Sequence, residues 1–189
     1  MKVLVTRHGQ TDWNVLRKIQ GQTDIDLNDE GRRQAEETAQ NIGDRKVDLI
    51  ITSPLKRAKE TAEIINKRFN VPIIEDKRLL ERGFGEFEGV TKDERNELKK
   101  IYPDIEYMWD YDKNVDVKGM EKVQDLCARI FSLLDEVTEK YSDKTVLLVT
   151  HGGTSVPIQC YFKVCTVHEL GNRQVVRGLN NCEIAEFDV

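Results

Sequence analysis

The chain has 189 residues, of which 39% are hydrophobic and 33% are charged, and its formal net charge is -5 at neutral pH. This acidic balance provides no broad basic surface for nucleic acid or an anionic membrane, so we expect neither as a partner. The longest apolar runs are far shorter than the roughly 20 residues of a membrane-spanning helix. The length is typical of one folded unit, and we predict a single soluble domain over residues 1–189.

The first residues do not resemble a secretory signal, because Arg7 follows the opening apolar run before a signal-peptide core could form. We therefore expect a cytoplasmic protein. The cysteines show no Cys-x-x-Cys spacing and stand at Cys127, Cys160, Cys165 and Cys182. We predict them as reduced packing residues, with a disulfide among them as the less favoured alternative, since disulfides are rare in the cytoplasm.

Strand-like and helix-like patterns alternate along the chain, which is typical of an α/β fold. Apolar runs predict strands at Lys2–Thr6, Leu49–Thr52, Ile73–Glu75, Thr145–Thr150 and Glu183–Phe187. Apolar residues at three- and four-residue steps predict helices over about 28–42, 53–69, 121–141 and 154–162. Asn28-Asp29-Glu30 supplies cap-type residues before the first helix, and Ser53 is expected to cap the second, with Pro54 at its first position. Continuous Val/Ile/Leu strands predict a three-layer fold, in which a mostly parallel central sheet has helices on both faces.

The stretch 89–119 differs from the rest of the chain. It is mostly charged and weakly periodic, and its aromatic residues Tyr102, Tyr107, Trp109 and Tyr111 stand close together. We predict an insertion near the carboxyl edge of the sheet. It is either a lid over the organic part of a ligand, since aromatic rings bury large areas at a small entropic cost, or a helical insert packed on the domain.

Two of the three histidines end matching apolar runs. His8 follows residues 3–7, His151 follows residues 147–150, and a glycine comes directly after each. Ligands bind just beyond the carboxyl ends of strands in open α/β sheets, and glycine lets a ligand approach closely. We therefore predict that His8 and His151 face each other across one site. His168 has no partner motif and is left outside the predicted site.

The segment from Arg7 to Asn14, Arg-His-Gly-Gln-Thr-Asp-Trp-Asn, resembles the signature of the histidine phosphatase superfamily, the phosphoglycerate-mutase-like enzymes. Further segments resemble later motifs in the family's order: Gly21-Gln22-Thr23-Asp24, Ser53-Pro54-Leu55-Lys56-Arg57-Ala58, Glu81 within residues 79–89, Glu121 with Asp125 and Arg129, and Thr150-His151-Gly152-Gly153. Together they extend to about residue 155. The resemblance implies a phosphoglycerate mutase-like fold.

The resemblance also implies a mechanism. A neutral His8 attacks phosphorus and forms a phosphohistidine that water then hydrolyses, while its other ring nitrogen donates to a backbone carbonyl. Arg7 and Arg57 are the implied clamp for the phosphoryl oxygens, and His151 is a further donor. Glu81 is the implied general acid and then the base that activates water, which requires it to be held protonated before the first step.

Substrate contacts are implied for Gln10, Asn14, Gln20, Gly21 and Gly152, beside Arg7 and Arg57. From the residues alone, the alternative is that Gln10 and Asn14 only satisfy loop backbone and that residues 20–23 are an ordinary turn. No side chains show metal-ligand spacing, and paired arginines would repel a divalent cation. We therefore predict no metal and no cofactor.

We predict a metal-independent phosphomonoester hydrolase that acts on a small phosphorylated metabolite. A cofactor-dependent phosphoglycerate mutase is the alternative, but Arg82-Gly83-Phe84 follows Glu81 without the mutases' tyrosine. Residues 89–119 offer Arg95 without an adjacent arginine pair, and Lys99-Lys100 lacks the bidentate fork. A mutase must also keep water from its phosphohistidine, for which this insertion is short.

A non-catalytic phosphate-binding scaffold is less favoured still, because the implied nucleophile, acid and phosphate ligands are all present. At the family level the resemblance suggests a homodimer, although the residues themselves do not reveal quaternary structure.

Overall fold

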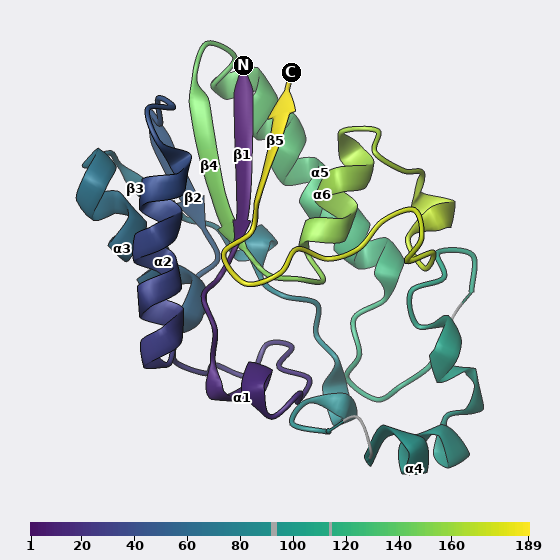
Figure 1. Ribbon diagram of the computed structural model, residues 1–189. Helices are drawn as coiled ribbons and strands as arrows, with labels where there is room; N and C mark the ends of the chain where they lie inside the picture. The colour runs from purple at the N-terminus through teal and green to yellow at the C-terminus, as the bar shows by residue number, and fades with distance from the viewer. Residues whose placement is uncertain (92–93, 114) are drawn as a thin grey trace.

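A computed structural model describes residues 1–91, 94–113 and 115–189. Among them, a five-stranded sheet has the order β3-β2-β4-β1-β5 (Figure 1). The strands are β1 (Lys2–Arg7), β2 (Leu49–Thr52), β3 (Ile73–Glu75), β4 (Thr145–Thr150) and β5 (Ile184–Asp188). β1 to β4 pair in parallel, and β5 runs antiparallel beside β1 at one edge. The predicted strands and the mostly parallel sheet are confirmed, with the last strand displaced by one residue.

Helices cover both faces of this sheet (Figure 1). One face carries α2 (Asp29–Ile42) and α3 (Lys56–Phe69), and the other carries α5 (Val123–Lys140) and α6 (Ser155–Tyr161). Alternation along β1 explains the two cores, because successive side chains of a strand point to opposite faces. Leu4 packs with the α2 and α3 residues, whereas Val3 and Val5 pack with those of α5. The predicted three-layer architecture is confirmed.

The helix starts differ in part from the predicted ones. Asn28 caps α2 as expected, because its side-chain oxygen accepts from the Gly31 N–H at 2.9 Å. The predicted cap and first position of α3 are wrong: this helix begins at Lys56 without a side-chain cap, and Pro54 precedes it. Ser53 is fully buried, and its hydroxyl lies against His151 instead. α5 likewise begins at Val123, two residues later than predicted.

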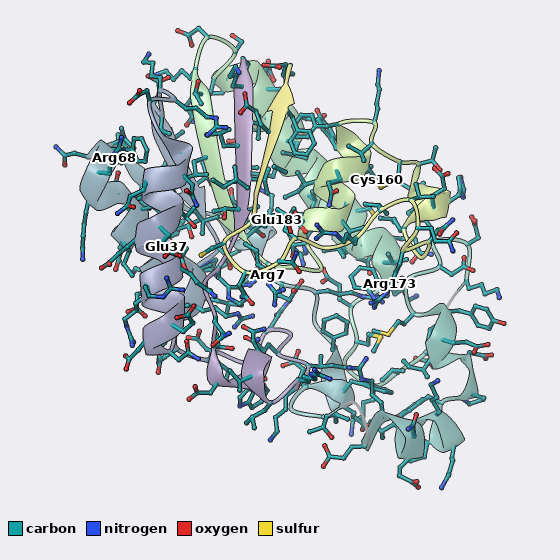
Figure 2. All side chains as sticks on the ribbon, viewed as in Figure 1. Arg7, Glu37, Arg68, Cys160, Arg173 and Glu183 are labelled. Atoms are coloured by element: carbon teal, nitrogen blue, oxygen red, sulfur yellow. A yellow bond between two sulfur atoms is a disulfide. The ribbon has the colours of Figure 1, made fainter. Side chains whose placement is uncertain are left out.

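The prediction of reduced cysteines is wrong for one pair. Cys160, on α6, and Cys165 form a disulfide with their Cα atoms 4.7 Å apart (Figure 2). Between them the chain reverses at Lys163, which has a φ of 64°, and this turn brings Cys165 back to the helix. Cys127 and Cys182 are free, and burial raises the pKa of each thiol to about 11.

The described part of the stretch 89–119 lies on the side of the molecule toward which the carboxyl ends of β1 and β4 point (Figure 1). Residues 92–93 and 114 within this stretch lie outside the described residues. It contains α4 (Glu94–Ile101) and a 3-10 helix, Pro103–Tyr107. Ile105 and Val117 form a small apolar core with Phe84 and Phe87. A four-residue helix, α1 (Asp12–Val15), follows the His8 loop; it is too short to give an apolar period. Within the described part of the chain, no helix has the length and apolar character needed to traverse a bilayer.

Candidate active site

His8 stands directly after β1 and is 2% exposed. Its Nδ1 lies 2.7 Å from the carbonyl oxygen of Gly9, so Nδ1–H donates there and Nε2 keeps its lone pair. Burial, helped by the charges of Arg7 and Arg57, holds the pKa of His8 well below its ordinary 6.5. The imidazole is therefore neutral and has one fixed tautomer, which is the state that a nucleophile requires.

Glycines fix the turn that carries His8. The Gly9 N–H donates to the Thr61 hydroxyl on α3 at 3.0 Å. A side chain at Gly9 would overlap the backbone of Gly31 on α2, and one at Gly31 would overlap the backbone of Gln10. The turn at His8 thus packs backbone against backbone on the first turn of α2, with no side chain between them.

Arg57, in the first turn of α3, also contacts His8. Its side chain is fully buried, and its Nε lies 3.3 Å from His8 Nε2. Its two terminal nitrogens donate to the carbonyls of Thr23 at 2.9 Å and Gly21 at 2.7 Å. Burial lowers the pKa of Arg57 to about 10, so it remains a cation at neutral pH. Backbone groups thereby hold its guanidinium against the His8 ring.

Glu88 holds the loop that orients Arg57. Its carboxylate accepts the N–H groups of Gln22 at 3.0 Å and Thr23 at 2.9 Å, and also the N–H of Phe84 at 3.0 Å. In the sequence this acid stands out only as part of a motif. Its contacts with Gln22 and Thr23 span more than sixty residues of chain, so no local pattern could have revealed them.

Arg7 is the second arginine whose charge acts on His8, and the two residues line the same cavity. Its Nη1 donates to the Leu179 carbonyl at 3.2 Å, and its Nε is buried without a partner among the described residues. Gly152 lies flat against this guanidinium, because a Cβ there would stand 3.4 Å from it. Arg7, which is partly buried, and Arg57, which is fully buried, thus place two positive charges near one imidazole.

His151 stands directly after β4, and its ring centroid lies 5.2 Å from that of His8. The two strand-end histidines are therefore neighbours, as the sequence predicts. His151 Nε2 lies 2.8 Å from the Ser53 Oγ, and Nδ1 is buried with no partner in the described part of the chain. Burial, followed by the charge of Arg57, lowers the pKa of His151 well below 6.5, so this imidazole is also neutral.

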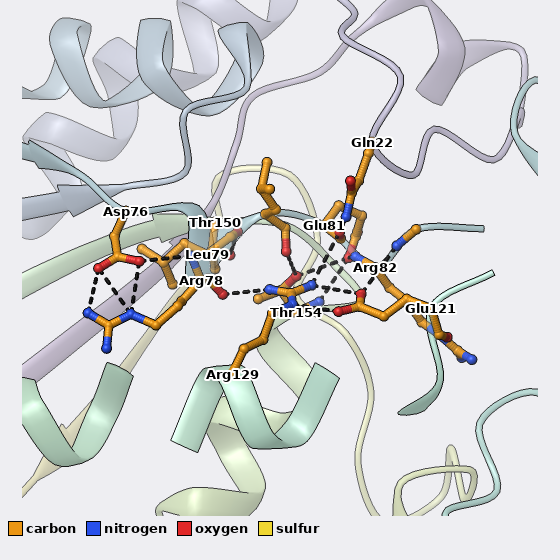
Figure 3. A network of polar contacts seen from close by, with 12 residues as sticks. Gln22, Asp76, Arg78, Leu79, Glu81, Arg82, Glu121, Arg129, Thr150 and Thr154 are labelled. Carbon is orange, nitrogen blue, oxygen red and sulfur yellow. Dashed lines mark hydrogen bonds and ion pairs between the residues drawn. The ribbon is translucent and has the colours of Figure 1, made fainter. Parts of the chain in front are cut away.

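Glu81 follows β3 and is 9% exposed. Its Oε1 accepts from the N–H of Arg82 at 2.9 Å and of Thr154 at 3.0 Å, and its Oε2 accepts from the N–H of Gly153 at 3.0 Å (Figure 3). A Cβ on Gly153 would come within 2.6 Å of Oε1. All these contacts use the carboxylate as an acceptor. The expectation that Glu81 is held protonated stays a prediction.

An ion pair behind Glu81 supports it (Figure 3). The Glu121 carboxylate accepts from Arg129 Nε at 2.6 Å and Nη2 at 2.9 Å. Arg129 also donates to the Glu81 carbonyl at 3.3 Å, and Arg82 Nε donates to the Glu121 carbonyl at 2.9 Å. The Glu81 carbonyl and the Arg82 side chain are thus tied to Arg129, on α5, and to Glu121, which precedes α5.

A cavity of about 650 Å³ opens above these groups. Arg7, His8, Arg57 and Glu81 form its floor, and the predicted contacts Asn14, Gln20, Gly21 and Gly152 line it. The Gln20 Oε1 is buried without a partner among the described residues. Gln10 does not line this cavity within the described residues, because its side chain turns away and accepts from Asn28 at 3.1 Å.

The outer wall of the cavity comes largely from the stretch 89–119. It includes Arg95, Lys99, Tyr107 and Trp109. His168, which has no partner motif in the sequence, also lines it, and its Nδ1 lies 2.8 Å from Asp112. Tyr102 packs on Phe87 instead, at a centroid distance of 5.8 Å. Within the described residues, no cluster of His, Cys, Asp and Glu could hold a metal ion.

Comparison with known proteins gives one consistent result. The family model described as "Histidine phosphatase superfamily (branch 1)" matches residues 3–189. The uncharacterized phosphatase PhoE of Bacillus subtilis is 40% identical over 184 residues, covering 97% of this chain and 89% of that protein. The solved structure of Bacillus stearothermophilus YhfR has a TM-score of 0.87 at 29% identity and covers 100% of this chain and 91% of that one. The solved structure of a mycobacterial glucosyl-3-phosphoglycerate phosphatase in complex with VO3 has a TM-score of 0.83 at 29% identity. It covers 98% of this chain and 91% of that one.

Proposed function

Because the chain belongs to the histidine phosphatase superfamily, we propose that it hydrolyses a small phosphorylated metabolite through a phosphohistidine on His8. The observation that carries this proposal is the state of the His8 ring. Its Nδ1–H is bound to the Gly9 carbonyl at 2.7 Å, and its Nε2 lone pair faces the buried guanidinium of Arg57. A neutral nucleophile beside fixed cations suits attack on a phosphate dianion.

In the first step, His8 Nε2 forms a bond to phosphorus while the bond from phosphorus to the ester oxygen breaks. Arg7 and Arg57 take up the charge that spreads over the equatorial oxygens, with forked donors that fit phosphate geometry. Glu81 gives its proton to the departing alkoxide. We assign His151 as a further donor to the phosphoryl group.

In the second step, water attacks phosphorus, and Glu81, now a carboxylate, takes the water's proton. The bond from phosphorus to Nε2 breaks, inorganic phosphate leaves, and His8 returns to its neutral state. The two guanidinium groups carry out the charge neutralisation that a metal ion performs in other phosphatases, which supports a metal-independent reaction.

The wall of the cavity supports the assignment of substrate contacts. Asn14, Gln20, Gly21 and Gly152 are assigned to binding, whereas Gln10 acts indirectly by holding Asn28. We assign the stretch 89–119 as a cover for the organic part of the substrate, supported by the position of Tyr107 and Trp109 at the cavity. The printed name of the mycobacterial neighbour favours phosphorylated sugar acids as the first substrates to test.

The test is phosphate release from a panel of phosphomonoesters in excess chelator, with the wild-type protein and His8→Ala. The panel includes 3-phosphoglycerate with and without its bisphosphate. Release that survives chelator and is lost in His8→Ala supports the hydrolase. Conversion of 3- to 2-phosphoglycerate with little release would identify a mutase, and turnover of none of these esters would identify a phosphate-binding scaffold.

A further inference from the structure

Ser53 follows β2 at the carboxyl edge of the sheet and is fully buried. The sequence pattern predicts Ser53 as the cap of α3, but this helix begins at Lys56 without a side-chain cap. Its Oγ lies 2.8 Å from His151 Nε2, and it accepts the Leu55 N–H at a long 3.4 Å. The hydroxyl thus lies behind the ring of His151, on the side of Nε2.

The position of one proton decides what His151 can do. A neutral imidazole carries one N–H, on either Nδ1 or Nε2. The Ser53 hydroxyl has one proton, and within the described residues His151 Nε2 is the acceptor in its reach. If Nε2 carried the proton, both the Ser53 O–H and the Nδ1 lone pair would be buried without partners.

The other tautomer leaves fewer groups unsatisfied. When Ser53 donates to Nε2, the imidazole proton lies on Nδ1, and Nδ1–H is then the one polar group left over. A buried unsatisfied donor costs free energy, so it is retained where a ligand will satisfy it. The His8 ring lies 5.2 Å away, and Arg7 and Arg57 make this the place for an anion.

We propose that Ser53 is a positioning residue, which holds His151 in the Nδ1–H tautomer so that Nδ1–H donates to a phosphoryl group on His8. The phosphoryl part rests on the proposed function, but the tautomer does not. Ser53 touches neither substrate nor nucleophile in this scheme. It acts through His151, much as the Gly9 carbonyl acts on His8.

Long-range proton–nitrogen NMR of histidine-labelled protein tests the tautomer directly. The chain has 3 histidines, and His8→Ala and His168→Gln assign their signals by elimination. We expect the wild-type His151 to be protonated at Nδ1 and unprotonated at Nε2, and we expect inorganic phosphate to shift the Nδ1 signal. A wild-type His151 protonated at Nε2 overturns the proposal without the need for any variant.

Kinetics of Ser53→Ala, on the best ester of the panel, test the consequence. Since the donor is misplaced rather than removed, we expect kcat to fall about tenfold to a hundredfold, with a smaller change in KM. Ser53→Thr retains the hydroxyl and should recover much of the loss. Thr38→Val removes another buried hydroxyl, which donates to the Gln34 carbonyl, and should leave kcat within about twofold.

A double variant separates this role from general support of the fold. In a His151→Ala background, the loss caused by Ser53→Ala should vanish, because residues that act through one another are not additive. A loss that persists in full there overturns the proposal. If His8→Ala still releases phosphate, the proposed function fails instead, while the NMR result on His151 stands on its own.

Discussion

The floor of the cavity and its cover are built in opposite ways. The floor, Arg7, His8, Arg57 and Glu81 with His151 adjacent to His8, is largely buried and bonded mainly to backbone groups beyond the carboxyl ends of the strands. The cover, defined as residues 94–113, is mostly exposed and meets the cavity through side chains that include Arg95, Lys99, Tyr107 and Trp109. Backbone anchors permit little movement, whereas side-chain contacts can exchange. The floor is therefore suited to holding the reacting groups in one geometry, whereas the cover is suited to determining which substrate binds.

Loss of the guanidinium fork from the floor should have the largest effect. For Arg57→Lys we expect kcat/KM to fall about a hundredfold or more, because a lysine cannot reproduce the fork held by Gly21 and Thr23. Steady-state kinetics on the best ester measures this. Arg68, in the last turn of the same helix, is the matched control, and Arg68→Lys should retain full activity. Equal losses in both variants would show that the helix rather than the site is damaged.

A small displacement within the floor should rank next. In Gly153→Ala the new methyl group would stand 2.6 Å from Glu81 Oε1 and push the carboxylate from its donors. We expect alkyl phosphates to lose about a hundredfold in kcat, and 4-nitrophenyl phosphate much less, because its leaving group needs no proton. Gly83→Ala, where a Cβ meets its nearest atom at 3.6 Å, is the control. An equal loss on both esters would argue against Glu81 as the general acid.

Burial of two neutral histidines in the floor should also make stability depend on pH. The pKa values of His8 and His151 lie well below 6.5 in the folded protein, so below that pH the unfolded chain binds protons that the folded one does not. The free energy of unfolding should therefore decrease as the pH is lowered, by at most about 1.4 kcal/mol per pH unit for each histidine. Urea unfolding across pH 5 to 7 measures the slope. His151→Gln should make this slope smaller. His168→Gln, which changes an exposed histidine, is the control and should not.

A change in the cover should have the smallest effect on the reaction itself. In Trp109→Ala we expect the ratios of kcat/KM among the esters to change several-fold, while kcat for the smallest ester stays close to wild type. Trp109→Phe keeps an aromatic wall and should lie between the two. An unchanged substrate profile would mean that Trp109 only packs the stretch 89–119 onto the three apolar clusters that it touches.

Local sequence patterns predicted the two histidines of the floor, the family resemblance implied Arg57 and Glu81, and neither predicted most of the contacts that support them. Apolar runs located β1 and β4, and the glycines after His8 and His151 indicated a shared site, because these signals lie within a few residues of each other. The contacts of Ser53 with His151 and of Glu88 with residues 22 and 23 join distant segments. The disulfide of Cys160 with Cys165 depends on a reversal at Lys163 that no Gly or Pro marks. His168 follows this reversal in the chain, and its place at the cavity could likewise not be foreseen from its neighbours in the sequence.

The contact of Gly9 with Gly31 ties the His8 turn to a helix rather than to a loop. Since no side chain separates the two backbones, neither position can be enlarged and then accommodated by repacking around it. A fluctuation that opens the first turn of α2 would move His8 as well, so amide exchange in that turn should report on how firmly His8 is held in place. For redesign, the transplantable unit is the turn together with α2, whereas the cover can be rebuilt without touching either.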